Sequence, residues 1–382
     1  MTTIIGDNVI SALGFSSEEN YDNVKAGKTG LRLFSDKYDI PEPFVASEID
    51  DERLETAFNQ LNIEKSHLYT KFEKATIVSA NEAIKRANIN PADDKVLFVL
   101  STTKGNVFLL GENEGKVFDS KQVYLWRSAQ LIAEFFGNRN EPLVVSNACI
   151  SGASAIIAGK RILQSKQFDY VIVIGVDVLS KFIVTGFQSF KALSQDVCKP
   201  FDAHRTGLNI GEAAATVILT ENPDNKINSR DIVCTAGAVR NDANHISGPS
   251  RTGEGSYLAL QKILENVNVE ELAFINAHGT ATPYNDEMES VSLTRAGLQN
   301  VPVNSLKGYF GHTLGAAGVL ESVISTQALK DGTVLKTYGF DTLGVTNLLN
   351  IAKNNLKTNK KQCIKLLSGF GGCNSAVLYT LF

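Results

Sequence analysis

The chain has 382 residues, of which 43% are hydrophobic and 20% charged, and its formal net charge is -4 at pH 7. That length suffices for two domains of ordinary size or for one large duplicated unit, and the composition is that of a globular protein. The slightly acidic balance argues against a nucleic-acid-binding protein, which normally presents a basic face.

The five cysteines form no CxxC pair, and their number is odd. This usage is typical of free thiols in a reducing compartment rather than of a secreted disulfide framework. The first residues lack a basic segment followed by a long apolar stretch, so we expect no signal peptide. The longest apolar runs have the length of strands, which excludes a membrane span. The sequence therefore predicts a cytoplasmic protein that binds neither membrane nor nucleic acid.

Apolar β-branched runs alternate with helical patterns through the first half of the chain. Near-continuous apolar strands between helices indicate a sheet that is covered on both faces. Strand patterns occupy 2–11, 95–102, 143–148, 170–178 and 213–220, and helical patterns occupy 72–89, 125–137 and 151–166.

After the polar stretch 221–231 the same series starts again. Strand patterns occupy 232–240, 272–279, 301–305, 363–372 and 374–382, and helical patterns occupy 256–267, 285–297 and 314–330. No residue-level repeat accompanies this similarity, so the duplication is one of architecture. We predict two βαβαβαββ halves, 1–225 and 226–382, in an α/β fold with two sheets and helices between and outside them.

Cys149 stands where the predicted strand 143–148 gives way to the predicted helix 151–166. Unpaired N–H groups and the helix dipole stabilise a thiolate at such a place, so we expect a lowered pKa for this thiol. The small residues that follow, Ser151 and Gly152 among them, would let a substrate and other backbone come close. The alternative is an inert core cysteine, because free cysteines are usually buried.

Two of the five histidines, His278 and His312, stand beside glycines at the end of a predicted strand and before a predicted helix. Ligands tend to bind at strand ends of a covered sheet, although either residue alone would suit an ordinary turn. A thiolate with two imidazoles suits acyl transfer, in which the thiolate attacks a thioester and donors stabilise the oxyanion. A metal site is not favoured, since these residues are far apart in sequence and include no short ligand pair.

Three charged residues and a glycine-rich run accompany the histidines. Lys307, five residues before His312, could orient a carboxylate or a histidine, or could simply be solvated. Asp286 and Glu289 open the helix after His278, where carboxylates also serve as capping charges. The run 368–374 lies between two predicted strands, so it lacks the context of a phosphate loop and could be only a tight hairpin.

Taken together and in this order, several stretches resemble the signatures of the β-ketoacyl-acyl-carrier-protein synthases, the elongating condensing enzymes of the thiolase-like fold. They are SNACISGASAI, GFQSFKALS, KPFDAHRTGLNIGEAA, NAHGTATPYND, NSLKGYFGHTLGAAG and SGFGGCNSAVL. The resemblance covers essentially the whole chain. It implies the layered α-β-α-β-α arrangement of that fold and an acyltransferase that catalyses decarboxylative condensation.

The resemblance also implies a role for each matching residue. Cys149 would accept an acyl group from a carrier thioester, and His278 and His312 would bind the malonyl thioester carbonyl and promote loss of carbon dioxide. The resulting carbanion would attack the acyl-cysteine and give a 3-oxoacyl product. Lys307 would support the second histidine, and the N–H groups of Cys149 and Phe370 would form an oxyanion hole, with Phe370 also acting as a gate. Asp286 and Glu289 would be structural carboxylates near the site. Contacts to the substrate or its phosphopantetheine would come from Thr280, Thr282, Gly371 and Asn374.

No metal and no organic cofactor is implied, because such enzymes receive their substrates on the phosphopantetheine of an acyl carrier protein. The implied assembly is a homodimer or a heterodimer with a related synthase subunit. Lys65, Lys71 and Arg205 could meet an acidic carrier, although a solvated surface is the alternative for each.

Departures from the family pattern include Ser368, Cys373, Ala281 and Thr206. They suggest a divergent, pathway-specific synthase for a polyketide-like or polyene chain rather than the housekeeping fatty-acid enzyme. One rival is a chain-length-factor-like partner, which would lack the nucleophile that Cys149 supplies. The others are a thiolase acting on coenzyme A thioesters, with Cys373 as its second thiol, and an inactive binding scaffold.

Overall fold

The structure is a computed structural model that describes residues 1–61, 66–111, 118–221 and 229–382. Ten strands form one continuous mixed sheet in the order β11-β10-β14-β15-β9-β1-β8-β6-β4-β5, with five from each half of the chain. They are β1 (Thr3–Ser11), β4 (Val96–Ser101), β5 (Leu143–Val145), β6 (Tyr170–Asp177), β8 (Ala213–Thr220), β9 (Ile232–Asn241), β10 (Leu272–Asn276), β11 (Val303–Asn304), β14 (Gln362–Gly369) and β15 (Cys373–Leu381).

The two five-stranded portions meet only where β1 pairs with β9. This antiparallel pairing is short, with Thr3 opposite Val233 and Ile4 opposite Ile232. We expected two separate sheets; here the N-terminal end of β1 satisfies backbone groups that β9 would otherwise leave at an open edge. The boundary predicted between 225 and 226 stays a prediction, because 222–228 lie outside the described residues.

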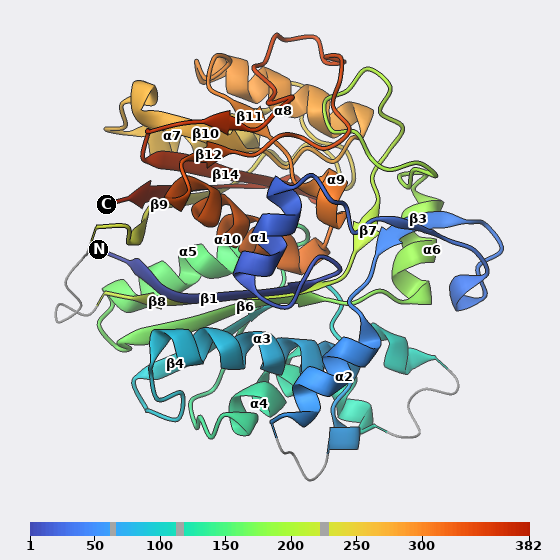
Figure 1. Cartoon of the computed structure of the whole chain (residues 1–382), viewed down its shortest axis with the longest axis vertical. Helices are drawn as coiled ribbons and strands as arrows, with labels where there is room; N and C mark the ends of the chain where they lie inside the picture. The colour runs from blue at the N-terminus through green and yellow to red at the C-terminus, as the bar shows by residue number, and fades with distance from the viewer. Residues whose placement is uncertain (62–65, 112–117, 222–228) are drawn as a thin grey trace.

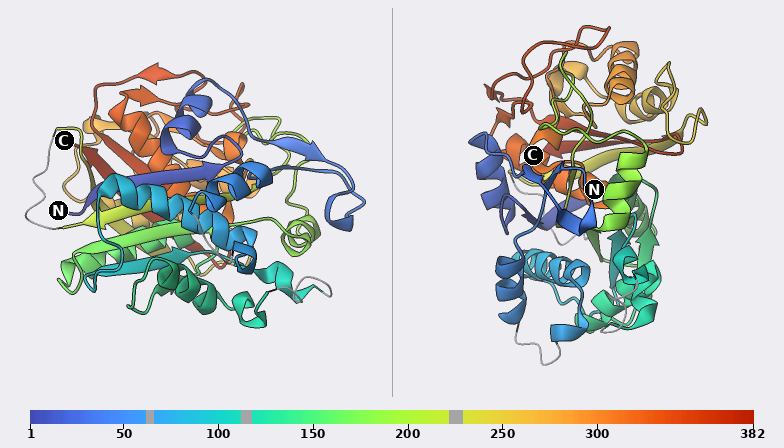
Figure 2. Two further views of the ribbon diagram at one scale, coloured as in Figure 1. Left: turned by 60° about the horizontal axis from the view of Figure 1, so that its bottom comes forward. Right: turned by 90° about the vertical axis from the view of Figure 1, so that its right-hand side faces the viewer.

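Helices cover both outer faces of the folded-over sheet and fill the space between its two portions (Figures 1 and 2). Three hydrophobic clusters correspond to the three helical layers, with the central cluster contacting both portions of the sheet, and the layered α-β-α-β-α arrangement is confirmed. The outer layer of the first half holds α2 (Asp51–Asn59), α3 (Lys71–Ala87) and α4 (Leu125–Phe135), the outer layer of the second half holds α7 (Glu254–Leu264) and α8 (Pro283–Arg295), and the central layer holds α5 (Ser151–Gln164) and α10 (Ala317–Lys330).

The two central helices approach one another closely because glycines lie at their contact. A Cβ added to Gly152 of α5 would lie 2.8 Å from the Val319 backbone nitrogen, and one added to Gly318 of α10 would lie 2.2 Å from that of Ala153. Nearly all of α10 is buried, including polar residues such as Glu321 and Ser322, as expected for a helix at the centre of the molecule. This packing brings the N-terminal ends of both helices to one region.

Smaller elements that the periodicity did not predict lie around this frame. The most relevant are α6 and the short strand β7, because β7 is bridged to the segment that carries His312. They comprise α1 (Ser17–Lys25), β2 (Arg32–Phe34), β3 (Phe44–Ser47), α6 (Lys181–Ser189), β7 (Ile210–Gly211), α9 (Lys307–Phe310), β12 (Thr333–Val334) and β13 (Leu356–Lys357).

Candidate active site

Cys149 lies on a tight turn between β5 and α5, as the sequence predicts. Ala148, just before it, adopts a left-handed φ of 44°, an uncommon conformation for a residue with a side chain. Ser151 fixes the turn, since its Oγ donates to the Ala148 carbonyl (2.6 Å) and accepts the N–H of Asn147 (2.8 Å). Ser151 thus braces the turn, and Gly152 lets the backbone of α10 come close, as expected. Access of a substrate past these residues stays a prediction.

The thiol of Cys149 is buried, and burial raises its pKa to about 12. The nearby Cys373 thiol adds to this rise, while Lys307, the Phe370 N–H and Lys104 oppose it. The expectation of a lowered thiol pKa is therefore wrong, because desolvation outweighs the favourable charges and hydrogen bond. The resting thiol is protonated at neutral pH, and a base must accept its proton when it attacks.

The fold brings Cys149, His278 and His312 together from three separate turns. The thiol sulfur and one ring nitrogen of each histidine all lie within 4.8 Å of one another, and all three residues are buried. The two imidazole rings lie edge to face with centroids 5.0 Å apart. The thiol and the two ring nitrogens could serve as metal ligands, so the separation of these residues in the sequence does not argue against a metal site. The absence of a metal stays a prediction.

His312 has a defined ring orientation. Its Nδ1 accepts the N–H of Leu314 (3.2 Å), which places the imidazole proton on Nε2, and Nε2 is buried without a hydrogen-bond partner among the described residues. Its backbone is also fixed, because its N–H donates to the Asn209 carbonyl (2.7 Å). Burial and the nearby Lys307 and Lys365 hold the pKa of His312 well below its usual value. A neutral imidazole with a free N–H donor results.

His278 follows β10 on a loop that two buried carboxylates hold in place. Glu289 accepts the N–H groups of His278 and Gly279, both at 2.7 Å, and Asp286 accepts the N–H of Thr280 at 3.0 Å. Both carboxylates belong to α8, and burial raises their pKa values, to about 7 for Glu289 and about 6 for Asp286. Burial also holds the pKa of His278 well below its usual value, and Lys307 and His312 contribute to that lowering.

Lys307 does not face solvent but belongs to a buried ion cluster. Its Nζ donates to Glu321, and Glu321 also lies 2.6 Å from the Nζ of Lys365. Sequence reasoning missed Glu321 and Lys365. The available signal was a glutamate inside the apolar pattern of α10 and a lysine inside the apolar pattern of β14, since charged residues in such runs are seldom buried without a partner.

Phe370 lies at the tip of the hairpin between β14 and β15, next to the nucleophile. Its N–H is directed at the Cys149 thiol, and its ring is 39% exposed. Two rings pack against it, Phe187 of α6 at 6.3 Å and Phe190, just after that helix, at 5.4 Å between centroids. An aromatic cluster therefore borders the region above Cys149, a position compatible with the predicted gate.

The four predicted substrate contacts divide into two pairs. The hydroxyl groups of Thr280 and Thr282 lie 2.9 Å apart on the His278 loop. Gly371 donates its N–H to the Ile246 carbonyl (2.7 Å), and the side chain of Asn374 accepts the Ser368 hydroxyl (2.7 Å). Gly371 and Asn374 thus stabilise the hairpin, and substrate contact by any of the four residues stays a prediction.

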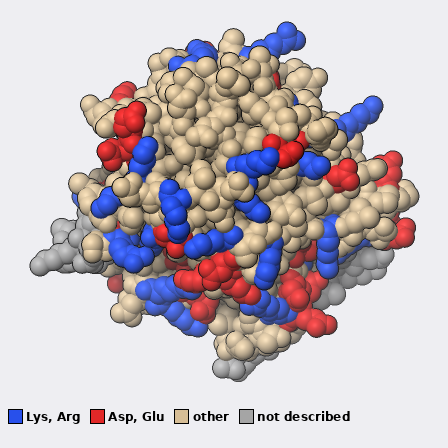
Figure 3. Space-filling model, turned by 45° about the horizontal axis from the view of Figure 1, so that its top comes forward, with Lys and Arg blue, Asp and Glu red and all other residues tan. Residues whose placement is uncertain are grey.

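Two of the three surface cations suggested for carrier binding already have partners. Lys71 forms ion pairs with Glu212 and Asp51, both at 2.7 Å, and Arg205 donates to the Gly344 carbonyl at 2.6 Å. Lys65 lies outside the described residues. On the face shown in Figure 3, basic and acidic side chains lie side by side rather than in a patch of one sign.

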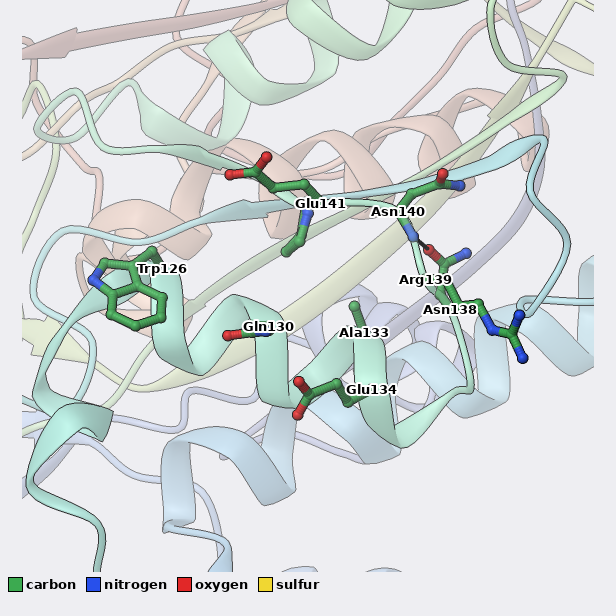
Figure 4. A pocket seen from close by; sticks show the side chains of 9 residues that line it. Trp126, Gln130, Ala133, Glu134, Asn138, Arg139, Asn140 and Glu141 are labelled. Carbon is green, nitrogen blue, oxygen red and sulfur yellow. Dashed lines mark hydrogen bonds between the residues drawn. The ribbon is translucent and has the colours of Figure 1, made fainter.

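A surface pocket of about 550 Å³ lies away from the buried triad, between α4 and the segment that leads into β5 (Figure 4). Trp126, Gln130 and Glu134 line one side of it, and Asn138, Arg139 and Glu141 line the other. The Asn140 N–H donates to the Asn138 side chain (2.9 Å) and shapes the segment beneath the pocket.

No described helix is both long and apolar enough to cross a bilayer.

Comparison with known proteins identifies the family. The beta-ketoacyl synthase N-terminal domain matches residues 2–225, and the beta-ketoacyl synthase C-terminal domain matches residues 232–341. A 3-oxoacyl-(acyl-carrier-protein) synthase 2 of Vibrio cholerae is 30% identical over 262 residues, which cover 64% of this chain and 63% of the relative. The enzyme of the same name from Staphylococcus aureus is 24% identical and covers 99% of this chain and 98% of its own.

Solved structures agree in fold. A ketosynthase (ApeO) in complex with its chain length factor (ApeC) from Xenorhabdus doucetiae superposes with a TM-score of 0.88 at 22% identity, covering 100% of this chain and 98% of that one. A chain from the complex of a type II PKS acyl-carrier protein with its ketosynthase (AntDE:AntF) gives a TM-score of 0.81 at 19% identity. The match covers 100% of this chain and 99% of that chain.

The match to the N-terminal domain alone spans more than half of the chain, and the C-terminal domain follows it in the expected order. The chain therefore belongs to the beta-ketoacyl synthase family, and it is a thiolase-like acyltransferase condensing enzyme of fatty-acid or polyketide synthesis.

Proposed function

We propose that this condensing enzyme is a 3-oxoacyl-acyl-carrier-protein synthase in which Cys149 carries the acyl group and His278 and His312 act on a malonyl thioester. One observation carries the proposal: the Cys149 sulfur and a nitrogen of each imidazole lie within 4.8 Å of one another in a buried site. Two neutral imidazoles beside a thiol supply both a proton acceptor and N–H donors for a thioester oxygen.

In the first half-reaction the Cys149 sulfur attacks the carbonyl carbon of an acyl-carrier thioester. The thiol proton passes to the His278 imidazole, because His312 Nδ1 already accepts the Leu314 N–H, and from there to the departing phosphopantetheine sulfur. The bond from carbonyl carbon to carrier sulfur breaks after the bond to Cys149 has formed. The N–H groups of Cys149 and Phe370 bind the oxyanion of the tetrahedral intermediate, and the direction of the Phe370 N–H toward the thiol supports this role.

In the second half-reaction the N–H donors of His278 and His312 bind the thioester carbonyl of malonyl-carrier. As carbon dioxide leaves, the electron pair of the broken carbon–carbon bond moves into an enolate whose oxygen these donors stabilise. The enolate carbon then attacks the acyl-Cys149 carbonyl, and the cysteine sulfur leaves. The product is a 3-oxoacyl thioester on the carrier, and the thiolate recovers a proton.

We further propose that a related subunit pairs with the edge strand β5. Leu143 on this strand is 38% exposed, and Tyr124 and Trp126 at the start of α4 are more than half exposed. An open strand edge beside exposed aromatic side chains is typical of a protein interface. The complexes of ketosynthases with a chain length factor and with a carrier protein support partners of these two kinds.

The substrate class of the proposal is a polyketide-like or polyene chain of a specialised pathway. Its support is the altered hairpin that carries Phe370. Ser368 donates to Asn374 across this hairpin (2.7 Å), and the Cys373 thiol contacts the Phe370 carbonyl (3.3 Å). Both residues therefore influence the conformation of the segment that borders Cys149.

The proposal is tested by incubating the protein with acyl-carrier thioesters of different length and unsaturation and measuring its intact mass. We expect one acyl group per chain, located on Cys149 by peptide mass spectrometry, and no acylation of a Cys149→Ala variant. A Cys363→Ala variant, which alters a buried cysteine of β14, should still be acylated. Failure of the wild-type protein to take up any acyl group would disprove the proposal, and acylation of Cys373 instead would favour a thiolase.

A further inference from the structure

Lys365 is a fully buried lysine in the otherwise apolar strand β14. A buried ammonium is stable only when it is paired and hydrogen-bonded. The Nζ of Lys365 lies 2.6 Å from Glu321 Oε2 and donates to the carbonyls of Asn276 (3.3 Å) and Ala277 (3.1 Å). These two carbonyls belong to the last residues before His278, so Lys365 contacts the end of β10 that carries this histidine.

The ion cluster around Lys365 has an excess of positive charge. Glu321 provides one carboxylate for two ammoniums, those of Lys307 and Lys365. With all three groups ionised, the cluster carries one net positive charge in a site from which water is excluded. Such a charge acts over a longer range than it would at the surface, because the surrounding dielectric constant is low.

Both imidazoles of the site lie within the field of this cluster. Lys307 and Lys365 each lower the pKa of His278 and of His312, in addition to the effect of burial. The other titratable groups around the pair are the Cys149 and Cys373 thiols, the buried Asp177, which accepts the Gly315 N–H, and two carboxylates of α8. The two α8 carboxylates are Asp286 and Glu289, and both accept N–H groups of the His278 loop.

The charge state of His312 has a structural consequence. Its Nδ1 accepts the Leu314 N–H, so a second proton on the ring would remove this hydrogen bond and place two N–H groups face to face. The backbone that precedes α10 would then have to move. The ring must remain neutral for its Nε2 donor to keep its direction.

We propose that Lys365 is a positioning residue of the decarboxylation step. Its ammonium holds the end of β10 that carries His278, and its charge, balanced with Lys307 against Glu321, keeps both imidazoles neutral below neutral pH. This inference rests on the proposed function of the two histidines. Besides the thiol and the two imidazoles, the reaction would then depend on the charge of Lys365, which never touches the substrate.

The first test is the pH profile of decarboxylation in a Lys365→Met variant, with malonyl-pantetheine as the probe. A lost positive charge lets the histidines accept protons at higher pH, so the acid limb of the profile should move to higher pH. Because burial lowers the pKa of Lys365 to about 8, the charge is present mainly below that pH. The rate at about pH 6 should therefore fall several-fold more than the rate at about pH 8.5.

The second test restores the net charge without restoring the lysine. A Lys365→Met/Glu321→Gln variant carries one positive charge, on Lys307, as the wild-type cluster does. Its acid limb should return toward the wild-type position, although two hydrogen bonds of Lys365 to backbone carbonyls and the two ion pairs of Glu321 are missing. Glu321→Gln alone adds positive charge and should move the acid limb to lower pH, which tests the inference even if Lys365→Met does not fold. Lys361→Met, an exposed site just before β14, serves as the control.

The outcomes separate this inference from the proposed function. A Lys365→Met profile that coincides with the wild-type profile, or a double variant that behaves like Lys365→Met, would overturn the electrostatic role of Lys365. If the wild-type protein does not decarboxylate the probe at any pH, the proposed function fails instead. In that case the titration of the isotope-labelled histidine rings, followed by NMR in the same variants, still decides the inference, because it requires no activity.

Discussion

The first half of the chain contributes a thiol on a tight turn to the site, whereas the second half contributes two imidazoles, two ammoniums and three carboxylates. Both halves use strands and helices in the same order, so the difference does not arise from the architecture. In the first half, backbone geometry at Ala148 and the brace from Ser151 position Cys149. In the second half, buried charges position the reactive groups and set their protonation. The same fold thus positions a nucleophile by shape and an electrostatic site by charge.

The largest expected effect comes from removing the thiol that the first half contributes to the site. Cys149→Ala should lower condensation at least about a thousandfold, because the proposed acyl acceptor is lost. Decarboxylation of malonyl-carrier should persist, since the second half supplies that step. Release of carbon dioxide and formation of 3-oxoacyl product are measured in parallel. Equal loss of both reactions would show that the halves do not divide the chemistry in this way.

Removing either imidazole should slow the decarboxylation step, whose reactive groups come from the second half of the chain. His312→Ala and His278→Ala should each slow decarboxylation by about 10²–10³-fold, the usual loss for a donor to a developing oxyanion. Acylation of Cys149 should fall less in His312→Ala, because His278 still accepts the thiol proton and the oxyanion hole of that step is made by backbone N–H groups. His278→Ala removes that base as well, so the comparison rests on His312→Ala. His204→Ala, at a side chain that is 81% exposed, is the control. A His312→Ala variant that loses acylation and decarboxylation to the same extent would contradict the comparison.

The protonated resting thiol predicts a distinctive pH dependence of alkylation. Because the pKa of Cys149 is raised to about 12, its thiolate fraction should rise about tenfold per pH unit between pH 7 and pH 9. Alkylation by iodoacetamide, followed by mass spectrometry of the Cys149 peptide, should rise in parallel without a plateau. Glutathione, an ordinary thiol, levels off within or just above this range and is the reference. A plateau below pH 8 would instead indicate the lowered pKa that the helix dipole favours.

The smallest expected effect concerns the packing that supports the nucleophile turn. Gly152→Ala places a methyl group against the backbone of α10 and should lower the free energy of unfolding by about 1–3 kcal/mol. Gly186→Ala in α6 is the matched control, because its added methyl meets no atom within 4 Å. Urea denaturation of both variants measures the difference. Similar stability of the two would remove the argument that shape, rather than charge, positions Cys149.

Much of the fold was predictable because hydrophobic periodicity marks buried elements. The strands at Ala213–Thr220 and Tyr170–Asp177 are almost wholly apolar, and the structure has them within a residue or two of the predicted bounds. Helix α1 was missed, since its sequence, SEENYDNVK, is largely polar and even its buried face includes Ser17 and Asn20. The pairing of β1 with β9 was also missed, because strand partners are a property of the whole chain.

The site was predictable in its residues but not in its energetics. Glycines and sequence position indicated Cys149, His278 and His312, and the structure brings the three together. The thiol pKa was wrongly predicted, because the degree of burial depends on side chains from both halves. Glu321 and Lys365 escaped notice, since each charged residue finds its counterpart only across the helix and sheet layers.

The contact between α5 and α10 has a consequence for synthesis of the protein. Helix α5 ends at Gln164, but the helix that covers its inner face begins only at Ala317. At ribosomal rates of about 5–20 residues per second, roughly 10–30 s separate their emergence. During that interval the apolar face of α5 has no permanent cover in the nascent chain. We expect the first half to be retained by chaperones until α10 is made, and expression of that half alone to yield aggregates.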